Sequence, residues 1–552
     1  MSFKKLLSAF LVFALVFVVQ SASAQDKTVT GKVTDSKDGS PVVGASVQPK
    51  GSRTGTSTKA DGTYSINVGP TVTTLVISSV GFETQEVSIA GKSSVDVSFV
   101  ASAGSNLNEV VVTGYGTARR RDLTGAISSV KAKDFNQGVV TSPDQLLQNK
   151  VAGMEVTNNS GQPGVATTIK IRGNNSIRAV NNPLYVIDGV PLDGRTARPS
   201  VTINQGFGST PESNPLLYIN PNDIAQIDVL KDASSAAIYG SRGANGVIVI
   251  TTKKATSGGT KLEFGTNFGA ALGYLKSYEI LSAAQFRTAL AKYAQPTSLD
   301  KGATIDALDA ITQKSLSQNY NLALSGGSET GKFRASFLAS RAIGFLKNSN
   351  LDKYLGSFGG QYKFLDKRLS VDFNLKAGNT KEDITNVSNT ADSKGNLISA
   401  ALSWNPTESF TDNTGAFITA GNGSGNPLAF SKAYSDIAKV NSFLGDISLG
   451  YKLMDNLEYK FLYAINHSTG ERNTNIDGWL GGYNGISGLG VGAKSFAKLT
   501  SQTFTHTVNY RTNLSSKIRL EALAGFEYWK SDYSGSTFSA PLKRGSFCTL
   551  HS

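Results

Sequence analysis

The chain is poor in the residues that build disulfide frameworks, metal sites and charged surfaces. It has one cysteine and three histidines in 552 residues, which excludes a disulfide framework and a cysteine-type zinc site and leaves little for histidine-based metal chemistry. Charged residues make up 17%, below the roughly 25% of ordinary soluble domains, and Lys+Arg exceed Asp+Glu by 54 to 41. With 57 glycines and 39% apolar residues, the chain fits neither a disordered nor a collagen-like protein. No common soluble enzyme class matches this composition, and we expect no catalytic residues and no cofactor.

Residues 1–24 are typical of an export signal. Lys4 and Lys5 precede an apolar run over 6–19, and an A-x-A cleavage site ends at Ala24. The run is shorter than the roughly 20 apolar residues of a membrane helix, and no later stretch approaches that length. An exported chain of this kind is either soluble beyond the inner membrane or crosses a membrane as a barrel.

Short alternating runs separated by turn residues fill 25–100 and predict a small β-sandwich. The Asp-Gly-x-Tyr sequence from Asp61 to Tyr64 resembles the carboxypeptidase regulatory-like domain. A peptidase is not favoured, because no histidine precedes His467 to hold zinc. A structural module is therefore expected.

A polar linker with a β-branched end follows at 101–119. Its segment Glu109-Val110-Val111-Val112-Thr113 has no obvious hairpin partner in the sequence. A strand without a partner is suited to joining the sheet edge of another protein through backbone hydrogen bonds. The residues leave open the alternative that it is the first strand of the next domain.

Residues 120–255 predict a compact α+β domain. Asn220 and Pro221 indicate a helix start, with the asparagine as cap and the proline at the first helical position. Asp232 is expected to cap a short alanine-rich helix that reaches Tyr239 and is stopped by Gly240. Asn-Gly then turns into a buried strand over 247–252.

Three segments in this region resemble the signatures of SusC/RagA-like TonB-linked outer-membrane proteins: VVVTGYGTARRRDLTGAISSV, PLYVIDGVPL and NPNDIAQIDVLKDASSAAIYGSRGANGVIVITTKK. The order of signal, carboxypeptidase-like domain, plug and barrel start is also similar to theirs. The resemblance implies a plug inside a large β-barrel that couples substrate binding to the TonB energy system. It assigns TonB contact to Glu109, Val110, Val111, Val112 and Thr113. It assigns plug signature positions to Arg172, Gly173, Asp188, Gly189, Asp232, Tyr239 and Gly240.

Residues 256–540 alternate as barrel wall, with apolar and aromatic residues expected to face lipid and polar residues to face the lumen. The fold class is therefore mainly β: an N-terminal β-sandwich, an α+β plug domain and the first part of a large antiparallel transmembrane β-barrel. A soluble sandwich, whose strands also alternate, is the alternative that the pattern alone leaves open. The stretches 381–440 and 470–495 lack steady alternation and are expected to be external loops. Possible ligand contacts in the second stretch are Asn475, Asp477, Trp479 and Tyr483.

Several other features do not change this interpretation. The sequence from Gly326 to Lys332 matches a phosphate-binding pattern, but Phe333 replaces the magnesium-binding Ser/Thr, and a hairpin turn is expected instead. The positive net charge is accompanied by no nucleic-acid-binding motif, so no nucleic acid partner is expected.

The alternation supports roughly nine or ten strands, whereas transporters with a plugged lumen use about 22. The pattern fades in the atypical tail 541–552, which contains Cys548. We therefore hypothesise a C-terminally truncated or frame-shifted member. An open barrel of this kind would not insert stably into lipid as a monomer, because its sheet edges would be unpaired.

The resemblance implies an outer-membrane importer for an oligosaccharide or peptide ligand. Its partners would be TonB with the inner-membrane motor, a SusD-like lipoprotein and outer-membrane lipid, with the N-terminal domain and plug facing the periplasm. Two alternatives stay open: a surface binding protein or adhesin that does not transport, and a non-functional remnant.

Overall fold

The structure is a computed structural model. It describes residues 27–36, 38–52, 54–70, 72–79, 82, 84–100, 110–113, 116–119, 127–174, 181–200, 212–271, 280–387, 396–418, 425–480, 490–515 and 518–542. The predicted export signal, Glu109 and the atypical tail after Leu542 lie outside them. Among these residues, no helix is both long and apolar enough to span a membrane. The chain divides into two units: one runs to Val111 and includes 118–123, and the other contains the rest.

The first unit is a small β-sandwich, as the alternation predicts. One sheet has the order β4-β1-β7 and the other the order β3-β2-β5-β6. Their bounds are β1 Lys27–Asp35, β2 Ser46–Pro49, β3 Thr56–Ser57, β4 Thr63–Val68, β5 Thr74–Ser78, β6 Gln85–Ser88 and β7 Val97–Phe99. Apolar side chains from both sheets form one core, which includes Val33, Leu75 and Phe99.

The Asp-Gly-x-Tyr sequence makes the turn into β4 and fixes its start. Gly62 has a positive φ of 79°, and Asp61 Oδ1 accepts a hydrogen bond from the Thr63 backbone at 3.0 Å. The buried Tyr64 hydroxyl donates to the Val95 carbonyl at 2.8 Å. The motif thus joins a local turn to a long-range contact.

The expectation that Val110–Thr113 lacks a hairpin partner is wrong. These residues form β8, which pairs with β9 (Gly116–Arg119) in a two-stranded sheet. The pairing is local, because the two strands are only two residues apart in the chain. A single two-stranded hairpin is marginally stable in water, so this pairing can be exchanged for another.

The second unit begins with the plug domain, whose main sheet has the order β10-β15-β16-β13-β14. A separate pair, β11-β12, completes its strands. Their bounds are β10 Ile127–Lys131, β11 Met154–Asn158, β12 Thr167–Ile171, β13 Leu184–Ile187, β14 Val190–Pro191, β15 Ile224–Leu230 and β16 Val247–Thr252. The short helices are η2 Ala132–Asp134, η3 Pro143–Leu147, η4 Pro221–Asp223, α2 Ala233–Ala236 and η5 Ala237–Gly243. The predicted buried strand over 247–252 is confirmed as β16 at the centre of the sheet.

Two helix predictions in the plug have different outcomes. Asn220 caps η4, since its side chain accepts a hydrogen bond from the Asn222 backbone at 3.0 Å and Pro221 follows as expected. Asp232 occupies the N-cap position of α2, but its side chain makes no capping hydrogen bond. The helical segment is also kinked at Gly240 (φ 60°) and continues as η5 to Gly243, instead of stopping there.

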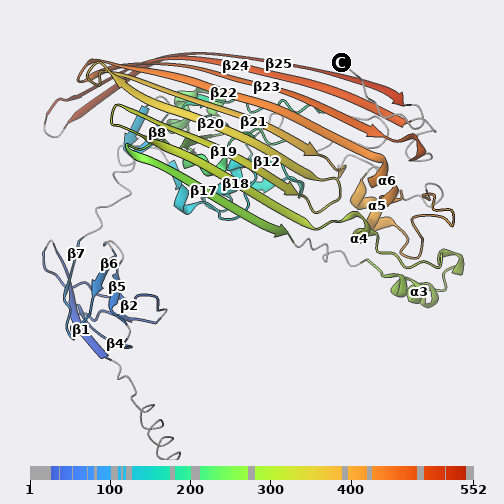
Figure 1. Cartoon of the computed structure of the whole chain (residues 1–552), viewed down its shortest axis with the longest axis horizontal. Coiled ribbons are helices and arrows are strands. Elements are labelled where there is room, and N and C mark those ends of the chain that lie inside the picture. The colour runs from blue at the N-terminus through green and yellow to red at the C-terminus, as the bar shows by residue number, and fades with distance from the viewer. Residues whose placement is uncertain are drawn as a thin grey trace, which may run out of the picture. The chain divides into compact units, whose positions relative to one another are not determined.

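The barrel wall is one antiparallel sheet in which β17 to β25 follow each other in chain order (Figure 1). Among the described residues it has nine strands, within the expected number. Their bounds are β17 Gly258–Ala271, β18 Ser315–Gly327, β19 Gly331–Ile343, β20 Asn350–Phe364, β21 Leu369–Asp383, β22 Tyr434–Met454, β23 Leu457–Ile476, β24 Gly490–Asn513 and β25 Arg519–Leu542. Figure 1 shows a curved sheet with the plug strands on its inner side. The predicted hairpin at Gly326–Lys332 is confirmed as the β18–β19 turn.

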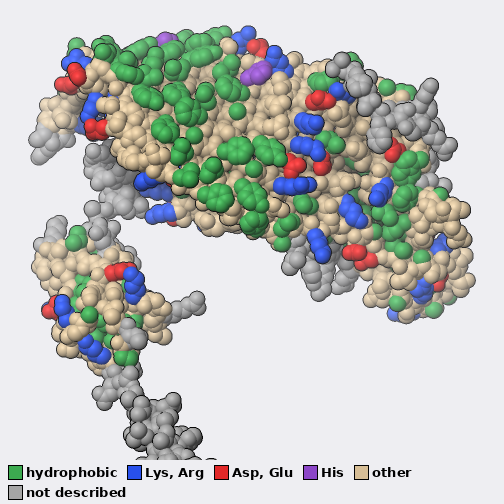
Figure 2. Space-filling model, viewed as in Figure 1, with side chains coloured by type: hydrophobic (Ala, Val, Ile, Leu, Met, Phe, Trp, Pro, Cys, Tyr) green, Lys and Arg blue, Asp and Glu red, His purple; other side chains and the backbone are tan. Residues whose placement is uncertain are grey.

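The two faces of the wall differ in chemistry. The outward face carries exposed apolar side chains such as Phe264, Phe337 and Phe358, and Figure 2 shows these gathered over the strands. The inward face is dominated by buried polar residues, for example Ser336, Ser468 and Thr505. This is the alternation expected of a sheet with lipid on one side and a polar lumen on the other.

The long connections lie at one end of the strands and carry helices. They contain α3 Ala283–Lys292, η6 Thr297–Leu299, α4 Ala307–Ile311, α5 Leu397–Ser403, α6 Pro427–Ala433 and η7 Gly478–Leu480. The predicted loop limits are too wide, because 434–440, 470–476 and 490–495 are strand. Strand ends that lie between loops and a polar interior need not carry apolar side chains, which explains the missing alternation.

The Tyr64–Val95 hydrogen bond yields a stability prediction. Tyr64→Phe should lower the unfolding free energy of the N-terminal sandwich by about 1–3 kcal/mol, because it leaves a buried carbonyl without its donor. Urea unfolding of a 25–100 fragment, followed by far-ultraviolet circular dichroism, measures this. The control is Thr28→Ala, whose hydroxyl bonds at the surface and should matter little. Equal unfolding midpoints for Tyr64→Phe and the unaltered fragment would contradict the prediction.

Candidate functional site: the contact between plug and wall

The apolar core of the plug continues onto the inner face of the wall. Leu338, Leu355, Leu444 and Leu462 face inward from β19, β20, β22 and β23, and they belong to the same buried cluster as the plug core. They interrupt the otherwise polar inner face where the plug packs against it. Sequence alternation alone does not predict this, because the leucines occupy positions expected to face water.

The first polar contact comes from the turn between β13 and β14. Asp188 (φ 50°) and Gly189 (φ 92°) make this turn, so the carboxylate leaves the plug sheet and meets Lys376 Nζ of β21 at 2.8 Å. Asp188 also accepts hydrogen bonds from the backbone and hydroxyl of Thr252, at 2.9 and 2.8 Å. Both charged side chains are buried. Burial alone would raise the pKa of Asp188, but the Lys376 ammonium and the Thr252 bonds hold that pKa below its usual value.

A second contact forms at the end of η4. The Asp223 carboxylate accepts hydrogen bonds from Ser336 and from Ser357, the latter at 3.0 Å, and pairs with Arg334 at 3.3 Å. Asn220, the cap of the same helix, also donates to Asp223 at 3.2 Å. The capped turn therefore holds a buried carboxylate against two wall strands.

In a third contact the charges are exchanged: the cation is on the plug and the carboxylate is on the wall. Arg198 pairs with Glu382 of β21 at 2.8 Å, and both side chains are almost fully buried. Ser213 of the plug donates to the other oxygen of Glu382 at 2.9 Å. The Glu382 carboxylate is thus satisfied by two separate plug segments.

The wall contributes one internal ion pair that also reaches the plug. Arg472 of β23 binds Asp436 of β22 through two nitrogens, at 2.8 and 2.5 Å, and neither side chain is more than 1% exposed. Arg472 donates a further bond to the Pro199 carbonyl at 3.0 Å. Next to it, the plug backbone lies so close to Gly470 that a Cβ there would be 1.9 Å from the Ala197 oxygen. A glycine is therefore required at this point of β23.

The remaining plug signature residues act within the plug. Arg172 (φ 59°) and Gly173 (φ 96°) make the turn after β12, and Arg172 forms an ion pair with Asp232. Tyr239 is buried in η5.

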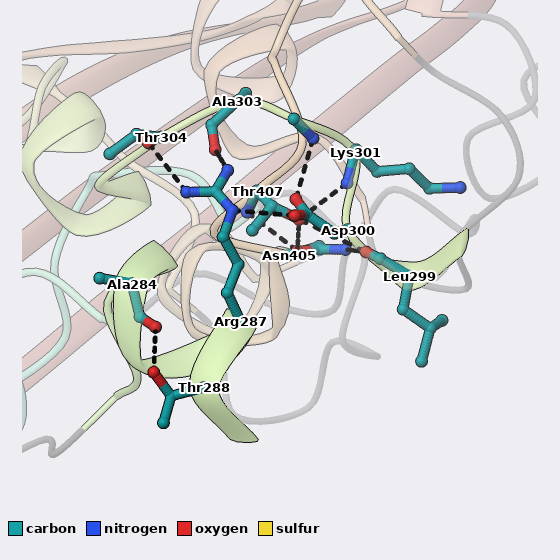
Figure 3. Close-up of polar contacts among 11 residues, drawn as sticks. Ala284, Arg287, Thr288, Leu299, Asp300, Lys301, Ala303, Thr304, Asn405 and Thr407 are labelled. Atoms are coloured by element: carbon teal, nitrogen blue, oxygen red, sulfur yellow. Dashed lines mark hydrogen bonds and ion pairs between the residues drawn. The ribbon is translucent and has the colours of Figure 1, made fainter. Parts of the chain in front are cut away.

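The loops at the helix-bearing end form a preassembled outer lobe (Figure 3). Arg287 of α3 donates to Asp300 at 2.9 Å and to the Ala303 carbonyl at 2.7 Å. The β21–β22 connection joins this network, because the Ala303 backbone donates to the Thr407 carbonyl at 2.7 Å and Asn405 donates to the Leu299 carbonyl at 2.8 Å. Hydrogen bonding to Arg287 lowers the pKa of the half-buried Asp300. Behind the network, apolar residues of α4, α5 and α6 share one core.

Of the predicted ligand contacts, Asp477 and Trp479 lie at this end and contact each other. Trp479 is 36% exposed, stacks on Phe417 with ring centroids 5.3 Å apart, and donates to Asp477 at 3.0 Å. Asn475 is on the opposite face of β23 from the inward-facing Arg472 and Thr474, which does not favour contact with a ligand in the lumen. Tyr483 lies outside the described residues. These four positions stay predictions.

Two regions of the chain match the models of known protein families. Residues 29–112 match the CarboxypepD_reg-like domain, and residues 119–247 match the TonB-dependent receptor plug domain. The structure shows a separate β-sandwich in the first region and the plug in the second. Among the described residues, no group of three or more His, Cys, Asp or Glu side chains is placed to hold a metal ion.

Curated relatives are similar over most of this chain. TonB-dependent receptor P3 of Formosa agariphila is 32% identical over 96% of the chain and 51% of its own length. TonB-dependent receptor SusC of Bacteroides thetaiotaomicron is 32% identical over 80% of the chain and 44% of its own length. The chain therefore spans about half the length of the curated relatives it matches.

Solved structures share the fold. The RagAB peptide importer in its closed-closed state matches with a TM-score of 0.63 and 19% identity, over 78% of this chain and 50% of that chain. The unliganded ferric citrate transporter FecA matches with a TM-score of 0.50 and 14% identity, over 79% of this chain and 52% of that chain. The plug and its wall, the sandwich before them and the relatives at 32% identity together place this chain among the SusC/RagA-like TonB-dependent receptors.

Proposed function

We propose that this chain serves in the import of an oligosaccharide or peptide across the outer membrane, through a plugged barrel energised by TonB. The observation that carries the proposal is a plug seated on the inner face of an apolar-coated wall through buried ion pairs. In the proposed orientation, the outer lobe faces the medium, and the short strand turns, the plug and the N-terminal sandwich face the periplasm. This orientation follows the common asymmetry of outer-membrane barrels, which have short periplasmic turns and long external loops. The proposed partners are TonB, its inner-membrane motor and a SusD-like lipoprotein.

The plug contacts suit a part that must seal and then move. Parting a buried ion pair is costly while both groups stay dry, but the cost falls when water reaches them. The polar inner face of the wall would admit that water as the plug shifts. The apolar part of the seat orients the plug beside these polar contacts.

The β8 strand is the proposed point of pull. It pairs only with β9 in the described structure, and such a hairpin can release its edge to an incoming strand of TonB. Backbone hydrogen bonds along a shared strand are loaded together, so they resist force without side-chain specificity. A surface binding protein or adhesin would not need a strand to which TonB can attach. Function that does not depend on energy would favour that alternative.

The pull can be tested by replacing one residue of β8. Val111→Pro, introduced into the chromosomal gene, should abolish uptake while ligand binding at the cell surface stays, because proline removes a backbone donor and blocks strand pairing. The readouts are growth on oligosaccharide or peptide mixtures as sole carbon source and ligand binding by intact cells. Val111→Thr keeps the β-branched shape and the backbone donor, so it should transport normally. Undiminished uptake by the proline variant would contradict the proposal.

The plug seat can be tested through the Asp188–Lys376 pair. Lys376→Met should make the plug unfold or detach more easily by about 3–5 kcal/mol, since it leaves a buried carboxylate without its cation. The readout is cleavage of residues 120–255 by added protease at increasing urea. Adding Asp188→Asn to Lys376→Met should restore much of the lost protease resistance. A double variant whose plug is cleaved at lower urea than that of Lys376→Met would contradict the pairing.

The same contact predicts a pH dependence. Because the pKa of Asp188 is lowered in the folded protein, the pair contributes fully above the unfolded pKa of about 4. The contribution is lost as the pH falls through the folded value. Plug resistance to protease should therefore decline in acid, and by less in Asp188→Asn. If protease resistance falls equally with pH in the unaltered chain and in Asp188→Asn, the pH dependence comes from groups other than Asp188.

A further inference from the structure

A cleft of about 560 Å³, counting its open mouth, lies between the end of the plug and the wall. Its plug side is the segment from Thr252 to Ala255, directly after β16, and its wall side is built by β19, β20 and β21. The wall residues that line it, such as Lys332, Gln361 and Asp372, lie near the short turns of the sheet. The plug seat described above forms one edge of this cleft but does not fill it.

Cations outnumber carboxylates in the lining. The cations are Lys253, Lys254, Lys332, Arg334 and Lys376, and the carboxylates are Asp223 and Asp372. Three further carboxylates lie next to these cations without lining the cleft: Asp188 on Lys376, Glu263 on Arg334 and Asp446 near Lys376 and Lys254. The charge that the cleft presents to a ligand therefore depends on which of these groups are already paired.

The lining carboxylates are occupied, whereas several of the cations are not. Asp223 is held by Arg334, Ser336 and Ser357, and Asp372 accepts from Gln361 at 2.6 Å. In the described part of the chain, Lys253, Lys254 and Lys332 form no side-chain ion pair. An incoming anion would therefore meet three lysines that form no ion pair with the carboxylates of the lining.

A buried group points to the same conclusion. Arg334 is 8% exposed, and its Nε has no hydrogen-bond acceptor among the described residues, although its Nη2 donates to Asp223 at 3.3 Å and to Glu263 at 3.2 Å. A buried guanidinium nitrogen without an acceptor costs free energy that a bound oxyanion would recover. Lys332 is two residues from Arg334 on the same inward face of β19, so both can address one ligand group.

Space for that group is left by a residue without a side chain. Gly359 is on the inward face of β20, between Ser357 and Gln361, and it lines the cleft. A Cβ at this position would lie 2.9 Å from Asn374 Oδ1, at the tip of a side chain that also lines the cleft. The glycine thus leaves room on the wall side of the cleft, which Lys253 and Lys254 also line.

We infer that this cleft is a binding site for an oxyanion group, and that it selects ligands carrying carboxylates at the exit side of the plug. The inference deepens the proposed function by naming a ligand class, but binding to the purified chain does not require transport. Acidic glycans and acidic peptides supply the same chemistry, and the experiment separates them.

The test is calorimetric titration of the detergent-solubilised full chain with two matched probe pairs. Trigalacturonate is compared with galactotriose, and triglutamate with triglutamine. Either acidic probe should bind measurably better than its neutral partner, and its affinity should fall between ~50 and ~300 mM NaCl because added salt screens exposed lysines. Binding of only one acidic probe would identify the source as glycan or peptide. Equal binding of acidic and neutral probes would overturn the inference.

Two lysine pairs locate the site. The double substitution Lys253→Ala with Lys254→Ala should lower the affinity for the acidic probe by at least about tenfold, because both removed groups are exposed donors in the cleft. Lys133→Ala with Lys150→Ala removes the same charge from exposed plug positions outside the cleft and should change affinity little. An unchanged affinity in the first variant, or an equal loss in both, would overturn the assignment. Circular dichroism checks that each variant is folded. If the purified, unaltered chain binds the acidic probe but cells that make it take up no ligand, the transport proposal fails and the binding site stands.

Discussion

Buried charges on the plug are neutralised by groups on the wall, and the rest of the assembly depends on this mutual neutralisation. Asp188 and Asp223 meet cations of β21 and β19, while Arg198 meets a carboxylate of β21. Because each side of the contact carries buried charges whose partners are on the other side, a displaced plug would leave these charges without their partners. The contacts therefore fix the position of the plug as well as holding it.

The opposite faces of the wall have separate tasks. Outward side chains such as Phe264 and Phe358 are apolar, whereas inward ones receive either the plug or water. A side-chain period of two makes both possible in one strand, so the sheet can meet lipid and still hold buried ion pairs. A polar plug seat also opens at modest net cost once water enters, which an apolar seat of equal area would not.

Much of the fold could be predicted from the sequence, because it rests on local patterns. Strand β16, the cap at Asn220 and the two-faced wall follow from residue type and spacing alone. The partners of the buried charges could not be predicted, since Asp188 and Lys376 are 188 residues apart in the chain. For the same reason, nothing marked the inward leucines such as Leu338 as a plug seat. Local spacing predicts Asp232 as a helix cap, whereas in the structure its side chain forms an ion pair with the distant Arg172 and no capping hydrogen bond.

Movement of the plug in cells can be followed directly by labelling a buried residue of its contact with the wall. Ser213 is a buried plug residue on Glu382, so Ser213→Cys, in a chain with Cys548→Ser, reports separation of this contact. Cells are given ligand and a membrane-permeant thiol reagent, with or without a protonophore. If the plug moves, Ser213→Cys should be labelled in energised cells, and the protonophore should abolish this labelling. Labelling that is equal in both conditions, or absent in energised cells that take up ligand, would contradict it.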